Sequence, residues 1–453
     1  MVDSTQRYKA YPEYKDSGVE WLGNIPSGWN KSLLKHYLLS MTGGGTPDSS
    51  SESNWTDSGE GIPWVSIADI TRSFEIKNTI KDVTRKGMLS KNLKVLPVDT
   101  VLYSIYASLG KVAVTKVPLV TNQAILGLET RKQLDSSFLV FWLIHIQPLL
   151  SLYSTSNTQE NLNAEKVGNL PLYIPSLIEQ KRIASFLDYE AAKIDILIEK
   201  QQRLIELLTE KRQAVISHAV TKGLNPDVPM KDSGVEWLGE VPGHWEVGYL
   251  GYYATLETGA TPSRANLKYW NGNIPWVKTG EIRYDTIYET EEKVTDLAIK
   301  QTSIRLSPAG TLLMAMYGQG ITRGRVALLG VPATYNQACV AITVNDEVFN
   351  EYMKWYFIAG YKALRDGGNE TSQMNLNADI VRKFKVLVPS IYEQKSIVDY
   401  LINKLPTFDN LLNKANQQIQ LMQERRTALI SAAVTGKIDV RDWDVHVASE
   451  VCS

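Results

Sequence analysis

The sequence predicts an α+β protein in which two globular α/β domains are separated by two long antiparallel coiled-coil helices, with a pseudo-twofold internal repeat. The nine residues 15–23 (Lys-Asp-Ser-Gly-Val-Glu-Trp-Leu-Gly) return unchanged at 231–239. Each copy is followed by β-rich runs broken by Gly, Pro and Asn, and then by a stretch with heptad periodicity. Chance does not produce such a match, so the chain contains one structural unit twice.

Shorter motifs recur in the same order in both halves and extend the repeat along the chain. The pairs are Gly45-Thr46-Pro47 with Ala260-Thr261-Pro262, Ile62-Pro63-Trp64-Val65 with Ile274-Pro275-Trp276-Val277, Asn122-Gln123-Ala124 with Asn336-Gln337-Ala338, Asn161-Leu162-Asn163-Ala164 with Asn375-Leu376-Asn377-Ala378, and Glu179-Gln180-Lys181 with Glu393-Gln394-Lys395. They predict an N-terminal repeated segment (1–24), a first globular domain (25–175), a helical spacer (176–222), a linker with the second repeated segment (223–240), a second globular domain (241–389), a second helical spacer (390–436) and a C-terminal tail (437–453).

The two spacers share one heptad register. In the second spacer Phe408, Ala415, Met422 and Leu429 fall at d, and Leu412, Ile419, Arg426 and Ala433 fall at a. The same register in the first spacer places Ile194, Gln201, Leu208 and Val215 at d, and Ile198, Ile205, Arg212 and Ala219 at a. Sustained a/d patterning predicts that the helices pack on each other. The alternative is that each helix packs only on its own domain, with the arginines reaching out to solvent.

Two further expectations concern the ends of these helices. Pro406 is expected to break or kink the second helix, whereas the first has Ala192 at this point, so the helices should start differently. If the helices are antiparallel, the segment 1–24 should lie near the tail 437–453.

Composition excludes several classes of protein. The 453 residues include two cysteines and five histidines in no cluster, which disfavours a disulfide framework and a zinc site and makes the cytoplasm the expected compartment. No apolar run is long enough for a transmembrane helix. The net charge of −1 hides local differences. Residues 72–94 are rich in lysine and arginine, and residues 281–296 are rich in acidic residues. In the segment 297–345 all the charged residues are basic. The basic stretches are candidates for phosphate contact, with ordinary solvated surface as the alternative.

No catalytic motif accompanies the repeat. The sequence lacks a Gly-x-x-x-x-Gly-Lys phosphate loop and the Asn/Asp-Pro-Pro-aromatic motif of amino-methyltransferases. Gly318, Gly320 and Gly324 miss the dinucleotide-binding spacing.

The duplicated motif order resembles the specificity subunit of type I restriction–modification systems over nearly the whole chain. The resemblance implies two target recognition domains, each recognising one half of a bipartite, asymmetric sequence in double-stranded DNA, and spacer helices that dock two modification subunits. In that family the modification subunits use S-adenosylmethionine to methylate adenine N6, and restriction subunits use ATP and Mg. The resemblance thus implies a non-catalytic chain that binds no cofactor, and it leaves open whether two restriction subunits join.

Candidate base contacts follow from the donors and acceptors that major-groove recognition needs. They are Thr46, Asp48, Ser66, Arg72, Tyr106, Ser108 and Lys111 in the first domain, and Ser263, Arg264, Lys278, Gln319, Thr322, Arg323 and Arg325 in the second. Packing or turn formation is the alternative for the tyrosine and serines, and solvated surface for Arg323 and Arg325. Asn122, Asn336, Trp64 and Trp276 are interpreted as structural residues. Residues 43–47 could approach a phosphate or form a plain turn.

The outer helix faces are the candidate docking surface for partners. They carry Glu206, Glu210, Lys211, Glu424 and Arg425. Two other functions stay open from the sequence. One is a two-armed coiled-coil protein-interaction adaptor without DNA specificity, and the other is an enzyme, which the missing motifs disfavour.

Overall fold

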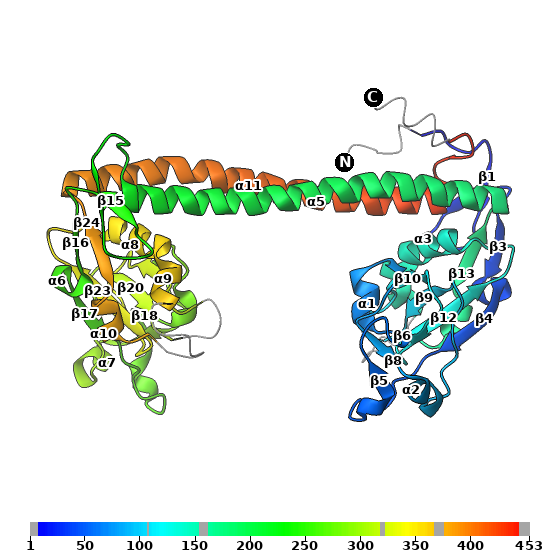
Figure 1. The fold of residues 1–453 in the computed structure, drawn as a ribbon, viewed down its shortest axis with the longest axis horizontal. Coiled ribbons are helices and arrows are strands. Elements are labelled where there is room, and N and C mark those ends of the chain that lie inside the picture. Colours follow the sequence, from blue (N-terminus) through cyan, green and yellow to red (C-terminus); the bar gives the residue numbers. More distant parts are fainter. Residues whose placement is uncertain (1–7, 107, 154–161, 318–321, 367–375, 444–453) are drawn as a thin grey trace. The chain divides into compact units, whose positions relative to one another are not determined.

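The computed structural model describes residues 8–106, 108–153, 162–317, 322–366 and 376–443. The chain forms two compact units, one from residues 1–201 and 417–453 and the other from residues 202–416. Each unit therefore contains one globular domain together with a part of both long helices (Figure 1).

The first domain is built on a five-stranded sheet with the order β4-β12-β9-β10-β7. Its strands are β4 (Leu38–Gly43), β12 (Ile125–Thr130), β9 (Val101–Ser104), β10 (Val112–Thr115) and β7 (Glu75–Ile76), and only the β10–β7 pair is parallel. Helix α3 (Ser136–Ile146) packs against β9 and β10 and leads into η4 (Gln147–Tyr153). The β-branched and aromatic residues of the two central strands are fully buried, as expected of strands covered on both faces.

A second, smaller sheet of the first domain contains the Ile-Pro-Trp-Val motif. Its order is β11-β6-β8-β5, with β11 (Val120–Thr121), β6 (Ile62–Val65), β8 (Lys81–Val83) and β5 (Trp55–Thr56). Helices α1 (Ile67–Arg72) and α2 (Arg85–Ser90) follow β6 and β8, and η3 (Glu52–Asn54) precedes β5. Separate pairs join β13 (Pro171–Ile174) to β3 (Asn30–Leu33), which leads through η2 (Leu34–Tyr37) into β4, and join β1 (Tyr14–Asp16) to β2 (Asn24–Pro26).

The second domain repeats this plan. Its main sheet has the order β17-β23-β20-β21, with β17 (Ala254–Thr258), β23 (Cys339–Val344), β20 (Leu312–Ala315) and β21 (Val326–Leu328). The parallel fifth strand of the first domain is represented by a single parallel bridge between Ile287 and Leu329. The small sheet is β19 (Lys293–Val294), β18 (Trp270–Val277) and β22 (Thr334–Tyr335).

The remaining elements of the second domain also have counterparts. The two-stranded pairs are β16 (Glu246–Tyr249) with β24 (Lys385–Val388) and β14 (Met230–Asp232) with β15 (Glu240–Pro242). The helices are α6 (Leu250–Tyr253), η5 (Leu267–Tyr269), η6 (Thr279–Glu281), α7 (Asp296–Gln301), α8 (Asn350–Ala359), α9 (Tyr361–Asp366) and α10 (Ala378–Arg382), with α4 (Ala164–Gly168) of the first domain matching α10. Helices α8 and α9 follow each other directly and meet at Gly360.

The two long helices begin at corresponding residues. Helix α5 spans Leu177–Lys222 and α11 spans Ile391–Val434, so the expectation of different starts is wrong. The expected break at Pro406 is also wrong, because α11 continues through the proline. Proline removes one backbone donor, but Leu405 and Phe408 are buried in the core of the second unit and hold the helix on both sides of it.

None of the helices in the described part of the chain combines the length and apolar character that a membrane crossing requires.

The heptad register describes the packing of α5 and α11 correctly. The assigned a and d residues are buried or half-buried, whereas most residues between them along the helix centres are exposed. The last turns of α11 join the core of the first domain, and Ile216, Ala219 and Val220 of α5 join the core of the second. Each helix therefore packs on both domains, and the alternative in which each serves only its own domain is wrong.

The arginines at the a positions form ion pairs between the helices. Arg212 Nε lies 2.9 Å from Asp409 Oδ1, and Arg426 Nε lies 2.9 Å from Asp195 Oδ1. In the first unit two tyrosines in contact connect the start of α5 to the end of α11. The Tyr11 hydroxyl donates to Glu179 in the first turn of α5, and the Tyr14 hydroxyl donates to Gly436 O just after α11. The helices are thus antiparallel there.

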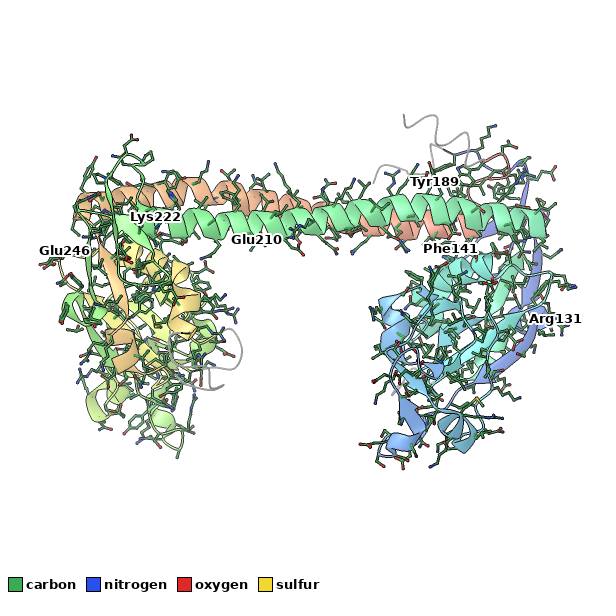
Figure 2. The ribbon with its side chains drawn as sticks, viewed as in Figure 1. Arg131, Phe141, Tyr189, Glu210, Lys222 and Glu246 are labelled. Atoms are coloured by element: carbon green, nitrogen blue, oxygen red, sulfur yellow. The ribbon has the colours of Figure 1, made fainter. Side chains whose placement is uncertain are left out.

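The described parts of the N-terminal segment and the C-terminal tail contact each other, as expected. The Asp439 N–H donates to Lys9 O at 2.7 Å, and the Trp443 ring lies against Phe186 of α5 at 5.5 Å between centroids. The end of α5 contacts the second repeated segment, since Lys222 Nζ donates to Leu238 O. Figure 2 labels Lys222 at this end of α5.

Candidate nucleic-acid interface

The Thr-Pro and Asn-Gln-Ala motifs, far apart in sequence, lie side by side in each unit. The Thr46 hydroxyl donates to Gln123 Oε1, and the Thr261 hydroxyl donates to Gln337 Oε1. The backbone N–H next to each Thr-Pro pair also bonds to the strand that leads into the Asn-Gln-Ala turn. The candidate Thr46 is therefore held within the scaffold by its own side chain.

The asparagines of these motifs form turns, as their interpretation as structural residues predicted. The Asn122 Oδ1 accepts from Ala124 N–H at 3.0 Å, and the Asn122 N–H donates to Val65 O. Asn336 makes both equivalent bonds in the second unit. The side-chain oxygen of each asparagine therefore completes the turn.

The glycines of the Thr-Pro turn are required by packing. A Cβ on Gly44 would lie 2.1 Å from Thr121 O, and a Cβ on Gly259 would lie 2.2 Å from Tyr335 O. Both distances are far below van der Waals contact, so only glycine allows the two chain segments to approach. The plain-turn interpretation of residues 43–47 accounts for this contact.

A pair of perpendicular tryptophans supports each small sheet. Trp55 and Trp64 lie 4.9 Å apart between centroids, and Trp270 and Trp276 lie 5.1 Å apart. Trp276 is 2% exposed and Trp64 is half-buried, in agreement with a structural role. The sequence did not reveal Trp55 and Trp270 as equivalent, because they stand at different distances from the Ile-Pro-Trp-Val motif.

Backbone carbonyls bind all four indole N–H groups. In the first unit Trp64 Nε1 donates to Gly45 O at 2.9 Å, and Trp55 Nε1 donates to Asp48 O at 3.0 Å. In the second unit the acceptors for Trp276 and Trp270 are Ala260 O and Ser263 O. The candidates Asp48 and Ser263 thus hold a tryptophan with their carbonyl groups, so their positions are set by the scaffold.

A carboxylate after β6, and one after β18, fixes the next turn. Asp69 accepts from Ser66 N–H at 2.8 Å and from Ile80 N–H at 2.9 Å. Glu281 accepts from Lys278 N–H at 2.7 Å and from Glu291 N–H at 2.8 Å. The candidates Ser66 and Lys278 therefore occupy equivalent backbone positions beside equivalent partners.

In the first unit a lysine lies over one ring of the tryptophan pair. Lys81 Nζ is 5.4 Å from the centre of the Trp55 ring, and no ion pair of Lys81 occurs among the described residues. Its neighbour Ile80 is 55% exposed. The surface here is a cation and an apolar side chain next to the hydroxyl of Ser66.

In the second unit the corresponding surface is an ion-pair network. The Arg264 guanidinium lies 3.9 Å from the centre of Trp270 and bonds both oxygens of Glu292. Lys278 Nζ lies 2.6 Å from Glu291 Oε2 and 3.3 Å from Glu292 Oε2. The hydrogen bond from Arg264 holds the pKa of Glu292 below its usual range, and the bond to Glu291 raises the pKa of Lys278.

The candidates Tyr106, Ser108 and Lys111 lie on the connection between β9 and β10. All three are exposed, and the Ser108 backbone is left-handed with φ 61°. The Ser104 hydroxyl donates to Ser108 O at 2.7 Å, and Ile105 N–H donates to the carbonyl of the Asn-Gln-Ala alanine. The connection is therefore anchored to the same turn that holds the Thr-Pro motif.

In the second unit Thr322, Arg323 and Arg325 lie on the equivalent β20–β21 connection, while Gln319 lies outside the described residues. The Arg325 N–H donates to Thr322 O at 3.1 Å and closes a turn. The Arg325 guanidinium lies 5.7 Å from the Tyr284 ring centre. The pKa of Tyr284 is raised, mainly because the ring is buried and to a smaller extent because Tyr361 is near. Both arginines are half-buried.

The candidates thus form two groups in each unit, one at the tryptophan pair and one on the β9–β10 or β20–β21 connection. Arg72 stands apart at the exposed end of α1.

The Asp48 carboxylate accepts hydrogen bonds from the hydroxyl and the backbone N–H of Ser50, and these bonds lower the pKa of Asp48. No group of three or more metal-ligating side chains occurs in the described part of the chain. The arrangement offers hydrogen-bond donors, acceptors and apolar contacts.

Sequence patterns place Lys81 in the basic segment 72–94 and Glu291 and Glu292 in its acidic counterpart 281–296. They do not align these residues with one another, and they do not single out Ile80. The signal that aligns them is the shared Val-Thr pair, Val83-Thr84 and Val294-Thr295, in which each threonine caps the next helix.

Comparison with known proteins identifies the family. The model of the type I restriction modification DNA specificity domain matches residues 26–207 and 242–421. The type I restriction enzyme MjaIX specificity subunit of Methanocaldococcus jannaschii is 25% identical, over 96% of this chain and 99% of that protein. The EcoR124I/EcoR124II specificity subunit of Escherichia coli is 28% identical over 43% of this chain and 47% of its own length.

Solved structures share the fold. A chain from a structure of a type I restriction–modification system matches with a TM-score of 0.71 and 13% identity, over 91% of this chain and 99% of that one. The HsdS subunit of Thermoanaerobacter tengcongensis matches with a TM-score of 0.51 and 13% identity, over 91% and 98%. Two tandem specificity domains account for most of the chain. The chain therefore belongs to the family of type I restriction–modification specificity subunits, non-catalytic components that carry two target recognition domains.

Proposed function

We propose that this subunit recognises a bipartite, asymmetric sequence in double-stranded DNA, one half per target recognition domain. The observation that supports this most directly is the pair of tryptophan sites. Their scaffold hydrogen bonds are the same, but the exposed side chains on them differ in charge and polarity. A scaffold used twice with two surfaces suits a target whose halves differ.

The helix pair is the proposed docking surface for two adenine-N6 modification subunits. Glu206, Glu210, Lys211, Glu424 and Arg425 are all exposed on α5 and α11. Figure 2 labels Glu210 on α5. In this proposal S-adenosylmethionine binds to the modification subunits, and ATP and Mg bind to restriction subunits where these join. This chain itself holds no cofactor.

The adaptor hypothesis remains the second candidate, and the family membership does not favour it. An adaptor would bind its partners without any dependence on DNA sequence. Salt-sensitive, sequence-dependent DNA binding by the assembled complex would contradict it.

The test is to express this chain with its cognate modification subunit in a methylation-free host and to map adenine methylation across the genome. We expect methylated adenines in one split motif. Replacing residues 241–389 with the corresponding domain of a relative should change one half of the motif and leave the other unchanged. A stable complex with an active modification subunit that methylates no defined motif would overturn the proposal.

A further inference from the structure

Four positions around each tryptophan pair are equivalent in the two domains. In the first domain Lys81 pairs with Trp64 across the β6–β8 ladder, and in the second Glu292 O accepts from Trp276 N–H. Val83 and Val294 pair with the first residue of their Ile-Pro-Trp-Val motifs, which fixes the register. Position 81 therefore matches 292, and 80 matches 291.

The other two positions follow from the same scaffold. Ser66 and Lys278 both directly follow the Ile-Pro-Trp-Val motif and both donate their backbone N–H to the fixing carboxylate. Ser49 and Arg264 stand two residues after the proline of the Thr-Pro pair. We call the sets 49, 66, 80, 81 and 264, 278, 291, 292 the first and second quartets.

The quartets differ at every position. The first consists of Ser49, Ser66, Ile80 and Lys81, with one cation and no carboxylate; the second consists of Arg264, Lys278, Glu291 and Glu292, with two cations and two carboxylates. All eight side chains are exposed or half-buried. Between the domains the backbone is retained while every side chain at these positions changes.

The scaffold does not need the quartet side chains. The bonds shared by both domains use backbone groups of the quartet residues, and the carboxylates and indoles that complete them lie outside the quartets. The Ser66 hydroxyl bonds Asp69, yet a lysine stands at this position in the second domain without loss of the backbone bond. A purely structural role would not require different side chains.

We propose that the quartets are specificity-determining surfaces of the two target recognition domains; this rests on the proposed function and deepens it. Lys81 supplies a hydrogen-bond donor, which suits the acceptors on the edge of guanine. Ile80 supplies an apolar contact, which suits the methyl group of thymine. Glu291 and Glu292 are acceptors, which suit a base edge with an exposed amino group, such as cytosine.

The charge of the second quartet favours a base edge over a phosphate. Its cations already bond its carboxylates, and the Glu291 side chain is 77% exposed. An exposed carboxylate beside a phosphate is repelled, whereas it can accept a hydrogen bond from a base amino group.

The test exchanges the two positions with the largest difference. Ile80→Glu/Lys81→Glu gives the first domain the acceptors of the second, and Glu291→Ile/Glu292→Lys makes the reverse change. The matched control is Leu39→Glu/Lys132→Glu, which makes the same change of charge and polarity at exposed positions of the first domain. Each variant is assembled with its modification subunit, and methylation is measured on DNA libraries in which one half-site is randomised.

We expect each exchange to alter the base preference in its own half-site by about tenfold at one or more positions, and the control to preserve it. The half-site of the other domain should stay unchanged in all variants. An unaltered preference in both exchange variants would overturn the proposal, as would equal changes in the control. Failure of the wild-type complex to methylate any split motif would instead overturn the proposed function.

Discussion

The two tryptophan sites differ in what their cations contact. Lys81 lies over Trp55 with no carboxylate partner among the described residues, whereas Arg264 lies over Trp270 and is bound by Glu292. The hydrogen bonds that position both sites are the same. The comparison shows that backbone hydrogen bonds hold the site, so exposed side chains can change independently of the fold.

A second comparison concerns the cavity between each domain and its part of the helix pair. In the first unit it is about 260 Å³ and is lined by Phe74, Phe141 and Arg426; in the second it is about 1220 Å³ and is lined by Trp355, Pro406 and Arg212. Phe74 lies over Arg426 at 5.6 Å, and Figure 2 labels Phe141 on α3 next to α5. The interhelical ion pair is thus retained while the packing around it changes.

The strongest effect should come from the tryptophans, whose burial differs. Trp276→Ala should lower the free energy of unfolding of the second unit by ~3–5 kcal/mol, because a fully buried indole is removed. Trp64→Ala should cost the first unit less, because Trp64 is half-buried. Denaturant unfolding followed by fluorescence measures both. Equal losses would show that the two sites are packed alike.

The turn glycines should give equal effects. Gly44→Ala and Gly259→Ala should each cost ~1–3 kcal/mol, because the new Cβ meets a backbone carbonyl. Gly28→Ala and Gly280→Ala are the controls, since nothing lies within 4 Å of their Cβ positions. A tolerated Gly259→Ala beside a damaging Gly44→Ala would break the equivalence of the turns.

The two interhelical ion pairs should be similar and weak. Double-mutant cycles on Arg212 with Asp409 and on Arg426 with Asp195 should give coupling free energies of at most ~1 kcal/mol, because both aspartates are half exposed. The coupling should fall as salt is raised. A strong coupling in only one pair would show that the helices are clamped unequally.

The smallest effect is the part of the pH dependence of stability that comes from Glu292 in the second domain. The pKa of Glu292 is lower in the folded state than in the unfolded state. Ionised Glu292 therefore stabilises the folded state above the unfolded pKa of ~4.3, and this stabilisation is lost as pH falls through the folded-state pKa. Glu292→Gln should therefore reduce the loss of stability on acidification by at most ~1 kcal/mol. Lys81→Gln is the matched change in the first domain and should leave this acid limb unaltered.

Much of the architecture could be predicted because it repeats or is periodic. Identical residues at 15–23 and 231–239 show the duplication directly, and the a and d positions of both spacers are the ones that pack. The break considered at Pro406 does not occur, because the burial of Leu405 and Phe408 overrides the local rule about proline.

The candidate site could be predicted only in part. The donors of Arg264 and Lys278 can be seen in the sequence, but their carboxylate partners, Glu291 and Glu292, come from the segment just before β19. That partnership depends on the register of β18 with β19, and a shift of one residue would turn Glu292 to the other face.

The sequence by itself determined the duplication, the heptad register and the family, because each is encoded in local order and spacing. Only the tertiary structure decided which side chains share a surface: Trp55 with Trp64, Lys81 with Trp55, and Arg264 with Glu292. These contacts join segments through strand pairing and turn geometry. Their free energy depends on three-dimensional distance, which spacing along the chain does not encode.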